Sequence, residues 1–165
     1  MHLAAVIFTF IAAVGSGLIA GLFFAFSNFV MKALGSVAPE RGMASMQAIN
    51  RTVLNPLFLG VFLGTAFVCA AAVIYAVWRW EAPGAAWLFF GAVLYLAGTL
   101  LVTMIFNLPL NDLLASVDPL SAEGVRVWQD YVVRWTVWNH VRTAASLAAT
   151  ASFILAFCRL RESLV

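Results

Sequence analysis

The chain has 165 residues, of which 64% are hydrophobic and only 10% are charged. Soluble domains carry roughly 25% charged residues, so this composition excludes an ordinary soluble protein and predicts one that is embedded in a membrane. The net charge is +2 and no cluster of basic residues is present, which excludes nucleic acid as a partner.

Four long apolar stretches predict four membrane spans, because about 20 apolar residues cross a bilayer as a helix. The first three stretches carry no charged residue, and the fourth is interrupted only by His140 and Arg142. The predicted spans cover residues 3–31, 53–78, 85–107 and 135–158. We therefore expect an all-α fold, a four-transmembrane-helix bundle formed by residues 1–165 as a single integral membrane domain, with the lipid bilayer as its partner.

The first span is expected to be a retained helix rather than a cleaved signal peptide. No Lys or Arg precedes its apolar run. The run is also far longer than the roughly 7–15 apolar residues of a signal peptide.

The two longer connections, 32–52 and 107–134, lie on the same membrane side and are expected to be partly helical. Apolar residues at helical spacing in 40–53 predict a short helix on the membrane surface. The segment Asn107-Leu-Pro-Leu-Asn111 is expected to end the third span, because a residue that precedes proline is pushed out of the helical region. Ser121 is a plausible cap for a helix that continues into the fourth span.

Four spans place both termini and the short 79–84 connection on the opposite side. This side has the higher density of basic residues, whereas the side of the longer connections has more of them in total, so the positive-inside rule favours neither orientation clearly. From the density we expect cytoplasmic termini, in a bacterial inner membrane. A homo-oligomer is left open.

Polar residues at the span ends converge on the side of the longer connections. An amide or a guanidinium in hydrocarbon must find a partner or water, and an intramembrane Arg is a candidate functional residue. We therefore expect a shared pocket at this level, walled by aromatic and aliphatic side chains. The candidate residues are Asn28, Asn55, Asn107, Asn111, Trp135, Trp138, Asn139, His140 and Arg142.

Structural interpretations of the same residues remain open. Asn55 is also the expected N-cap of the second span, before Pro56. Asn107 and Asn111 could only close the third span, and Asn28 could only join helices. Arg142 could extend to the membrane surface, and His140 could be a core histidine.

The sequence makes a metal or haem site improbable, and we expect no cofactor. His2 and His140 fall at opposite ends of the bundle, so one subunit cannot bring both to one iron. The spans contain no Asp or Glu, and their two Cys are expected at different depths. A haem or metal held by one ligand stays open. Ion transport stays open too, although an acidic relay is missing.

Four segments resemble the anthrone oxygenase-like family, also classed as a domain of unknown function. They are GLFFAFSNFVMKAL (21–34), INRTVLNPLF (49–58), FNLPLNDLL (106–114) and WQDYVVRWTVWNHVRT (128–143). The resemblance implies a small four-helix membrane protein. It also implies oxidation of a lipophilic polycyclic anthrone to an anthraquinone with dioxygen, without metal or flavin. Many bacterial members have no assigned function.

The residue chemistry suggests how such a reaction would proceed. His140 would act as a base, and Arg142 and Asn139 would stabilise the enolate or phenolate oxygen. Asn107 and Asn111 would shape the mouth of the pocket. The alternative is a non-enzymatic membrane protein that binds a lipid, a quinone or another small molecule, or an accessory subunit with a structural polar cluster.

Overall fold

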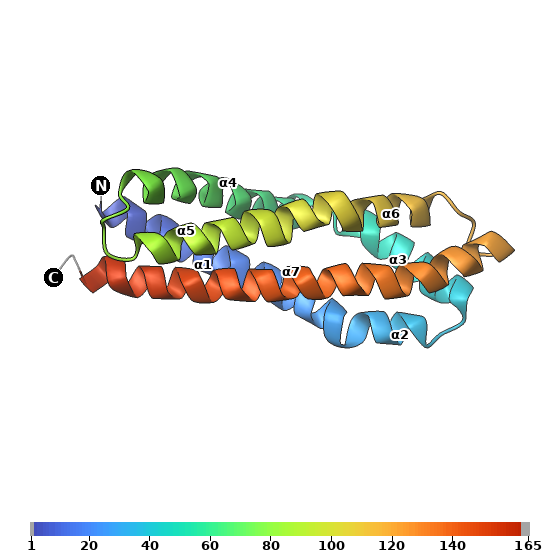
Figure 1. The fold of residues 1–165 in the computed structure, drawn as a ribbon. Coiled ribbons are helices and arrows are strands. Elements are labelled where there is room, and N and C mark those ends of the chain that lie inside the picture. Colours follow the sequence, from blue (N-terminus) through green and yellow to red (C-terminus); the bar gives the residue numbers. More distant parts are fainter. Residues whose placement is uncertain (1, 163–165) are drawn as a thin grey trace.

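The computed structural model describes residues 2–162, and they form an elongated bundle of helices (Figure 1). In this range four helices are long and apolar enough to cross a membrane. They cover Leu3–Gly35, Pro56–Trp78, Ala85–Ala115 and Ala122–Arg161. The all-α fold with four membrane-spanning helices is thus confirmed, and the protein is an integral membrane protein.

The described chain forms the following elements, of which all but α3 belong to the spans. They are α1 (His2–Ala25), η1 (Phe26–Val30), α2 (Met31–Gly35), α3 (Pro39–Thr52), α4 (Pro56–Trp78), α5 (Ala85–Val93), η2 (Leu94–Leu101), η3 (Thr103–Asn107), α6 (Leu108–Ala115) and α7 (Ala122–Glu162). The three η elements are π-helical turns that interrupt otherwise continuous helices. Both chain ends lie at one end of the bundle, and α2, α3 and α6 lie at the other (Figure 1).

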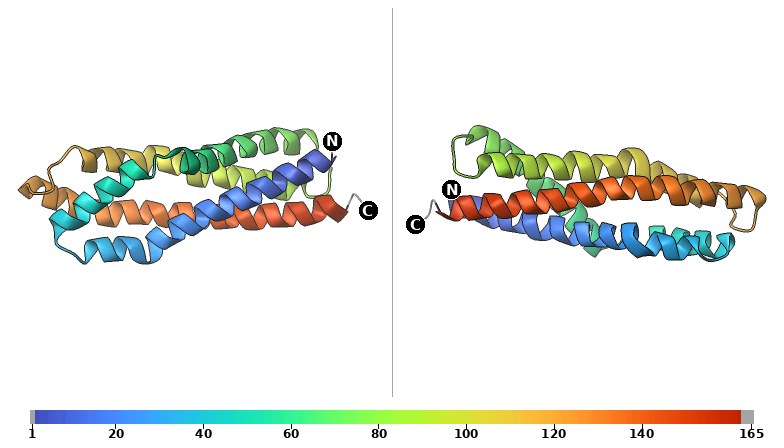
Figure 2. Two further views of the ribbon diagram at one scale, coloured as in Figure 1. Left: turned by 180° about the vertical axis from the view of Figure 1, so that it is seen from behind. Right: turned by 60° about the horizontal axis from the view of Figure 1, so that its bottom comes forward.

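The longer connections are helical, as predicted. The helix α3 runs from the end of α2 back to the start of α4 and crosses the bundle obliquely (Figure 2). Its buried side chains Met43 and Met46 pack in an apolar cluster with residues of α6 and α7. The helix α7 continues without interruption through the fourth span, over 41 residues.

The third span does not end at Asn107, and this prediction is wrong. The helix continues through Pro109 to Ala115. A proline in a helix removes one backbone hydrogen bond and crowds the carbonyl four residues earlier. The π-helical turn η3 ends directly before α6, and such a widened turn leaves room for the proline ring.

Two apolar clusters fill the bundle, with a polar layer between them. The larger cluster lies among α1, α4, α5 and α7 and includes Phe62, Tyr95 and Phe153. The smaller one gathers Met31, Met43 and other residues of the longer connections around the first half of α7. Buried polar side chains of α7, including Asn139, Arg142 and Ser146, lie between the clusters. The candidate site occupies this layer.

Candidate functional site

The central feature of the polar layer is Arg142, whose side chain is only 4% exposed. Its Nη2 donates to Asn139 Oδ1 at 2.7 Å, and its Nη1 donates to Thr103 Oγ1 at 3.2 Å. The guanidinium carbon lies 4.1 Å from the ring centre of Phe23 and 5.0 Å from that of Trp135. Aromatic faces thus cover the cation, while polar groups take two of its five N–H donors.

Among the described residues, Arg142 has no carboxylate partner. The ion pair between Arg134 and Asp130 lies on the surface, and no acidic residue of the described chain pairs with Arg142. Its Nε is buried without a hydrogen-bond partner. A buried guanidinium therefore keeps an uncompensated positive charge at this point, which favours an anionic ligand.

Asn139 holds this arrangement in place by joining α7 to the end of α1. Its Nδ2 donates to the backbone oxygen of Phe23 at 2.7 Å and to Ser27 Oγ at 2.8 Å. The hydroxyl groups of Ser27 and Thr143 lie 3.1 Å apart. The amide oxygen of Asn139 is thereby fixed toward Arg142.

A second hydrogen-bond network adjoins the first on the side of Trp135, whose ring centre lies 5.0 Å from the guanidinium carbon of Arg142. Asn111 Oδ1 accepts from the Tyr131 hydroxyl at 2.8 Å and from Trp135 Nε1 at 2.9 Å. Asn50 donates to the same Tyr131 hydroxyl at 3.4 Å. Asn107 is fully buried, donates to the backbone oxygen of Trp135 at 3.3 Å, and keeps an unpartnered Oδ1.

A cavity of about 530 Å³ connects the two polar levels. Arg142 and Thr103 line it at the deeper level, and polar side chains of α3 and α6 line it at the other. Most of the remaining wall is aromatic or aliphatic. The cavity is lined, among others, by Phe23, Gln47, Asn50, Arg51, Leu54, Leu63, Thr103, Met104, Leu108, Asn111, Asp112, Trp135 and Arg142.

The structure brings five of the predicted residues together. Arg142, Asn111 and Trp135 line the cavity. Asn139 and Asn107 do not line it but are hydrogen-bonded to Arg142 and to the Trp135 backbone. The predicted convergence of span-end polar groups holds for this subset.

The other four predicted residues lie elsewhere, and the prediction that they belong to the shared pocket is wrong. His140 and Asn28 are exposed on the outside of the bundle. Asn55 is exposed and caps α4 by accepting from the Phe58 backbone amide at 3.0 Å. Trp138 stacks on Phe106 with ring centres 3.5 Å apart and does not line the cavity. His140 is thus not placed to act as a base in this cavity.

Sequence reasoning did not select Thr103, Phe23 or Asp112. Thr103 is four residues before Asn107 and therefore shares its helix face, a signal that was available. Phe23 and Asp112 have no such signal, because an apolar residue in a span and an acid in a connection are both ordinary. Only the packing of the helices assigns them to the cavity.

Within the part of the chain that the structure describes, no three His, Cys, Asp or Glu side chains are grouped so that they could hold a metal ion. The groups that line the cavity are instead suited to an organic ligand. A guanidinium and amides bind oxygen atoms, and the aromatic wall fits a flat apolar body.

The chain matches the family described as anthrone oxygenase over residues 57–152. This range is more than half of the chain and holds α4, the third span and most of α7, including Thr103, Asn111, Trp135 and Arg142. Searches of curated proteins and of solved structures gave no match. The chain belongs to the anthrone oxygenase family.

Proposed function

We propose that the protein is a cofactor-independent oxygenase, which oxidises a lipophilic polycyclic phenol or ketone with dioxygen. One observation carries this proposal: a buried guanidinium without a carboxylate partner lines an apolar cavity. The volume of about 530 Å³ lies within the range of roughly 300–1,000 Å³ that is usual for small-molecule sites. The family assignment supports the same reaction class.

The reaction requires stabilisation of an anion. Loss of a proton from the ring methylene of an anthrone gives a carbanion whose charge is shared with the carbonyl oxygen. Arg142 would stabilise that oxygen in a site with little water, where a fixed cation acts strongly. Asn139 and Thr103 would hold the guanidinium in position.

The remaining steps balance without a further reactant. The methylene carbon bonds to one oxygen atom of dioxygen and loses both hydrogens, and the second oxygen atom leaves as water. Asp112, a carboxylate that lines the cavity, is the group that we assign as the proton acceptor in place of His140.

Oxygen uptake on addition of an anthrone to the protein in lipid nanodiscs tests this function. We expect Arg142→Gln to lower kcat by about 10²–10³, the usual cost of removing one donor that stabilises an oxyanion. Asp112→Asn is expected to lower kcat as well. The matched control is Arg134→Gln, because Arg134 lies on the same helix with its side chain 59% exposed.

The result also separates an enzyme from a binding protein. Wild-type protein that binds an anthrone but takes up no oxygen would overturn the enzymatic assignment and leave a small-molecule-binding membrane protein. Unchanged turnover in Arg142→Gln would overturn the role of the guanidinium.

We propose further that the protein lies in a bacterial inner membrane with its termini in the cytoplasm. The basic residues near the ends of the spans on the terminus side support this orientation. In this orientation the cavity lies in the outer leaflet.

A further inference from the structure

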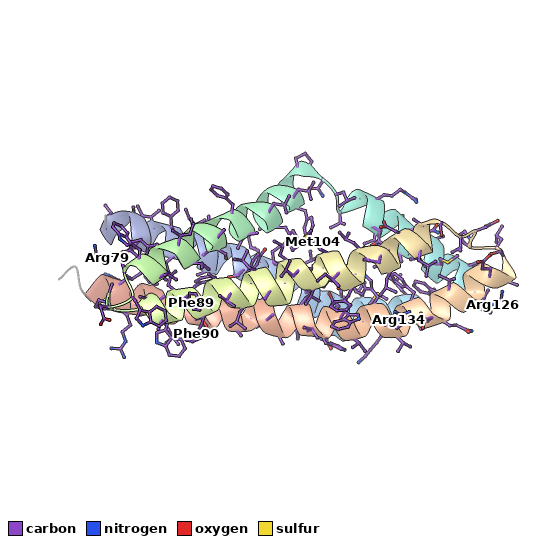
Figure 3. All side chains as sticks on the ribbon, turned by 45° about the horizontal axis from the view of Figure 1, so that its top comes forward. Arg79, Phe89, Phe90, Met104, Arg126 and Arg134 are labelled. Carbon is purple, nitrogen blue, oxygen red and sulfur yellow. The ribbon has the colours of Figure 1, made fainter. Side chains whose placement is uncertain are left out.

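One side of the cavity is open between α4 and the helix formed by η3 and α6. The lining residues at this opening are exposed, with Leu63 at 52%, Met104 at 54%, Leu54 at 60% and Leu108 at 40%. By contrast, Phe23 lines the same cavity from within the bundle and is only 5% exposed. We call the opening bordered by Leu54, Leu63, Met104 and Leu108 the side window; Figure 3 labels Met104 beside α4.

The side window lies at the depth of the lipid chains. Leu63 follows Pro56, the first residue of α4, by seven residues, which corresponds to about 10 Å along the helix. The 23 residues of α4 are about 34 Å long and cross a hydrocarbon core of roughly 30 Å. The window residues are apolar, so this opening faces acyl chains rather than water.

Helix α3 covers part of the cavity at the end that faces water. Gln47 Nε2 donates to the backbone oxygens of Leu114 at 2.7 Å and Val117 at 3.2 Å. Met43 and Met46 on the same helix are 0% and 1% exposed. Helix α3 is therefore fixed to α6 and α7 at this end and narrows access from water.

Polarity changes along the opening. Arg51 and Asp112 are exposed and line the cavity near its outer end, whereas the border of the window is aliphatic. An aliphatic border with polar groups at its outer end suits the passage of a molecule that has an apolar ring body and polar substituents.

We propose that the ligand reaches Arg142 sideways from the membrane, through the side window. The ligand class is an aromatic amphiphile dissolved in the leaflet, with an acidic oxygen that pairs with the guanidinium. This inference rests on the proposed function for the identity of the ligand, but the route itself is tested by binding alone.

The experiment uses the full chain in nanodiscs with 1,8-dihydroxyanthraquinone as the probe, at a fixed ratio of probe to lipid. Because this quinone is already oxidised, its binding is independent of any oxygenase activity. Rapid mixing with probe-free and probe-loaded vesicles gives the association and dissociation rates from the fluorescence of the probe. The variants Leu63→Trp and Met104→Trp, alone and combined, narrow the window.

We expect the combined variant to lower both rates by about tenfold, since an entry barrier slows passage in both directions. Leu57→Trp is the matched control, because Leu57 lies on the same helix, is 80% exposed and does not line the cavity. Met43→Ala, which loosens α3 from α6 and α7 at a position that does not line the cavity, is expected to leave both rates unchanged.

An unchanged association rate in every window variant would overturn the side route, and so would faster association in Met43→Ala. Met104→Trp alone gives the measurement if the combined variant does not fold. If the wild-type protein binds the probe but takes up no oxygen with an anthrone, the proposed function is contradicted. The side route would still stand.

Discussion

The charge of Arg142 is stabilised without being neutralised. Placing an Arg in a membrane span costs about 3 kcal/mol on insertion scales. Two hydrogen bonds and the faces of Phe23 and Trp135 offset part of this cost, since a cation over an aromatic ring gains about 0.5–2 kcal/mol. A carboxylate partner would offset more, but it would also compete with an anionic ligand. Its absence is therefore the strongest residue-level argument for a ligand site.

His140 provides a test of this residue-level assignment. His140→Ala is expected to leave oxygen uptake and thermal stability nearly unchanged, because the side chain is exposed and outside the cavity. Surface substitutions usually change stability by less than about 0.5 kcal/mol. Turnover by the variant is measured beside Arg142→Gln, and a comparable loss in both would show that the imidazole takes part in the reaction.

The sequence could identify Arg142, Asn139, Asn107 and Asn111, because buried polar groups in a membrane need partners and stand out in apolar spans. It could not separate these residues from His140. Arg142 and His140 flank Asn139 at about 60° and 100° on the helical wheel, and an arc of that width is compatible with a single cavity wall. In the structure only the Arg142 side of this arc faces the cavity, because the packing of the neighbouring helices determines which side is buried.

At the element scale, a glycine motif in the sequence does not show where the helices approach one another most closely. Gly17 and Gly21 form a small-xxx-small pattern, yet nothing lies within 4 Å of a side chain added at Gly21. The tight contacts are made instead by Gly15 against Thr65 and by Gly98 against Ala145. The prediction that the third span ends before Pro109 was wrong because a π-helical turn can accommodate a proline that an ideal helix cannot.

Gly98→Val is expected to destabilise the bundle. The added side chain would collide with Ala145 and force η2 away from α7, and such overpacking costs roughly 1–3 kcal/mol. Thermal unfolding in one detergent measures the effect. The control is Gly64→Val in α4, where no atom lies within 4 Å, and an equal loss in both variants would contradict the assigned contact.

At the scale of the whole molecule, the sequence predicted the number of spans and the end at which the polar groups gather. Those features follow from hydrophobic length and from the cost of polar groups in hydrocarbon. For the cavity, the sequence predicted only the end of the bundle at which it lies. Its walls depend on how far α4 and η3 separate and on the position of α3, and neither follows from one sequence pattern.

The orientation of the bundle in the membrane can be tested by labelling its two ends. The 79–84 connection lies at the end of the bundle with both termini, and the 116–121 connection lies at the other (Figure 1). We expect Leu120→Cys to react with a membrane-impermeant maleimide on intact spheroplasts, and Glu81→Cys to react only after permeabilisation. Both variants carry Cys158→Ser, because Cys158 is exposed whereas Cys69 is buried.

Two outcomes of this labelling have different meanings. The reverse pattern would overturn the cytoplasmic placement of the termini and move the cavity to the inner leaflet, with the bundle unchanged. Labelling of both positions from the same side would contradict the assignment of the third span, because the single long helix between residues 81 and 120 could not then cross the membrane. Since the third span lies between these positions and part of the cavity is built on it, that outcome would also remove the basis for a cavity at hydrocarbon depth.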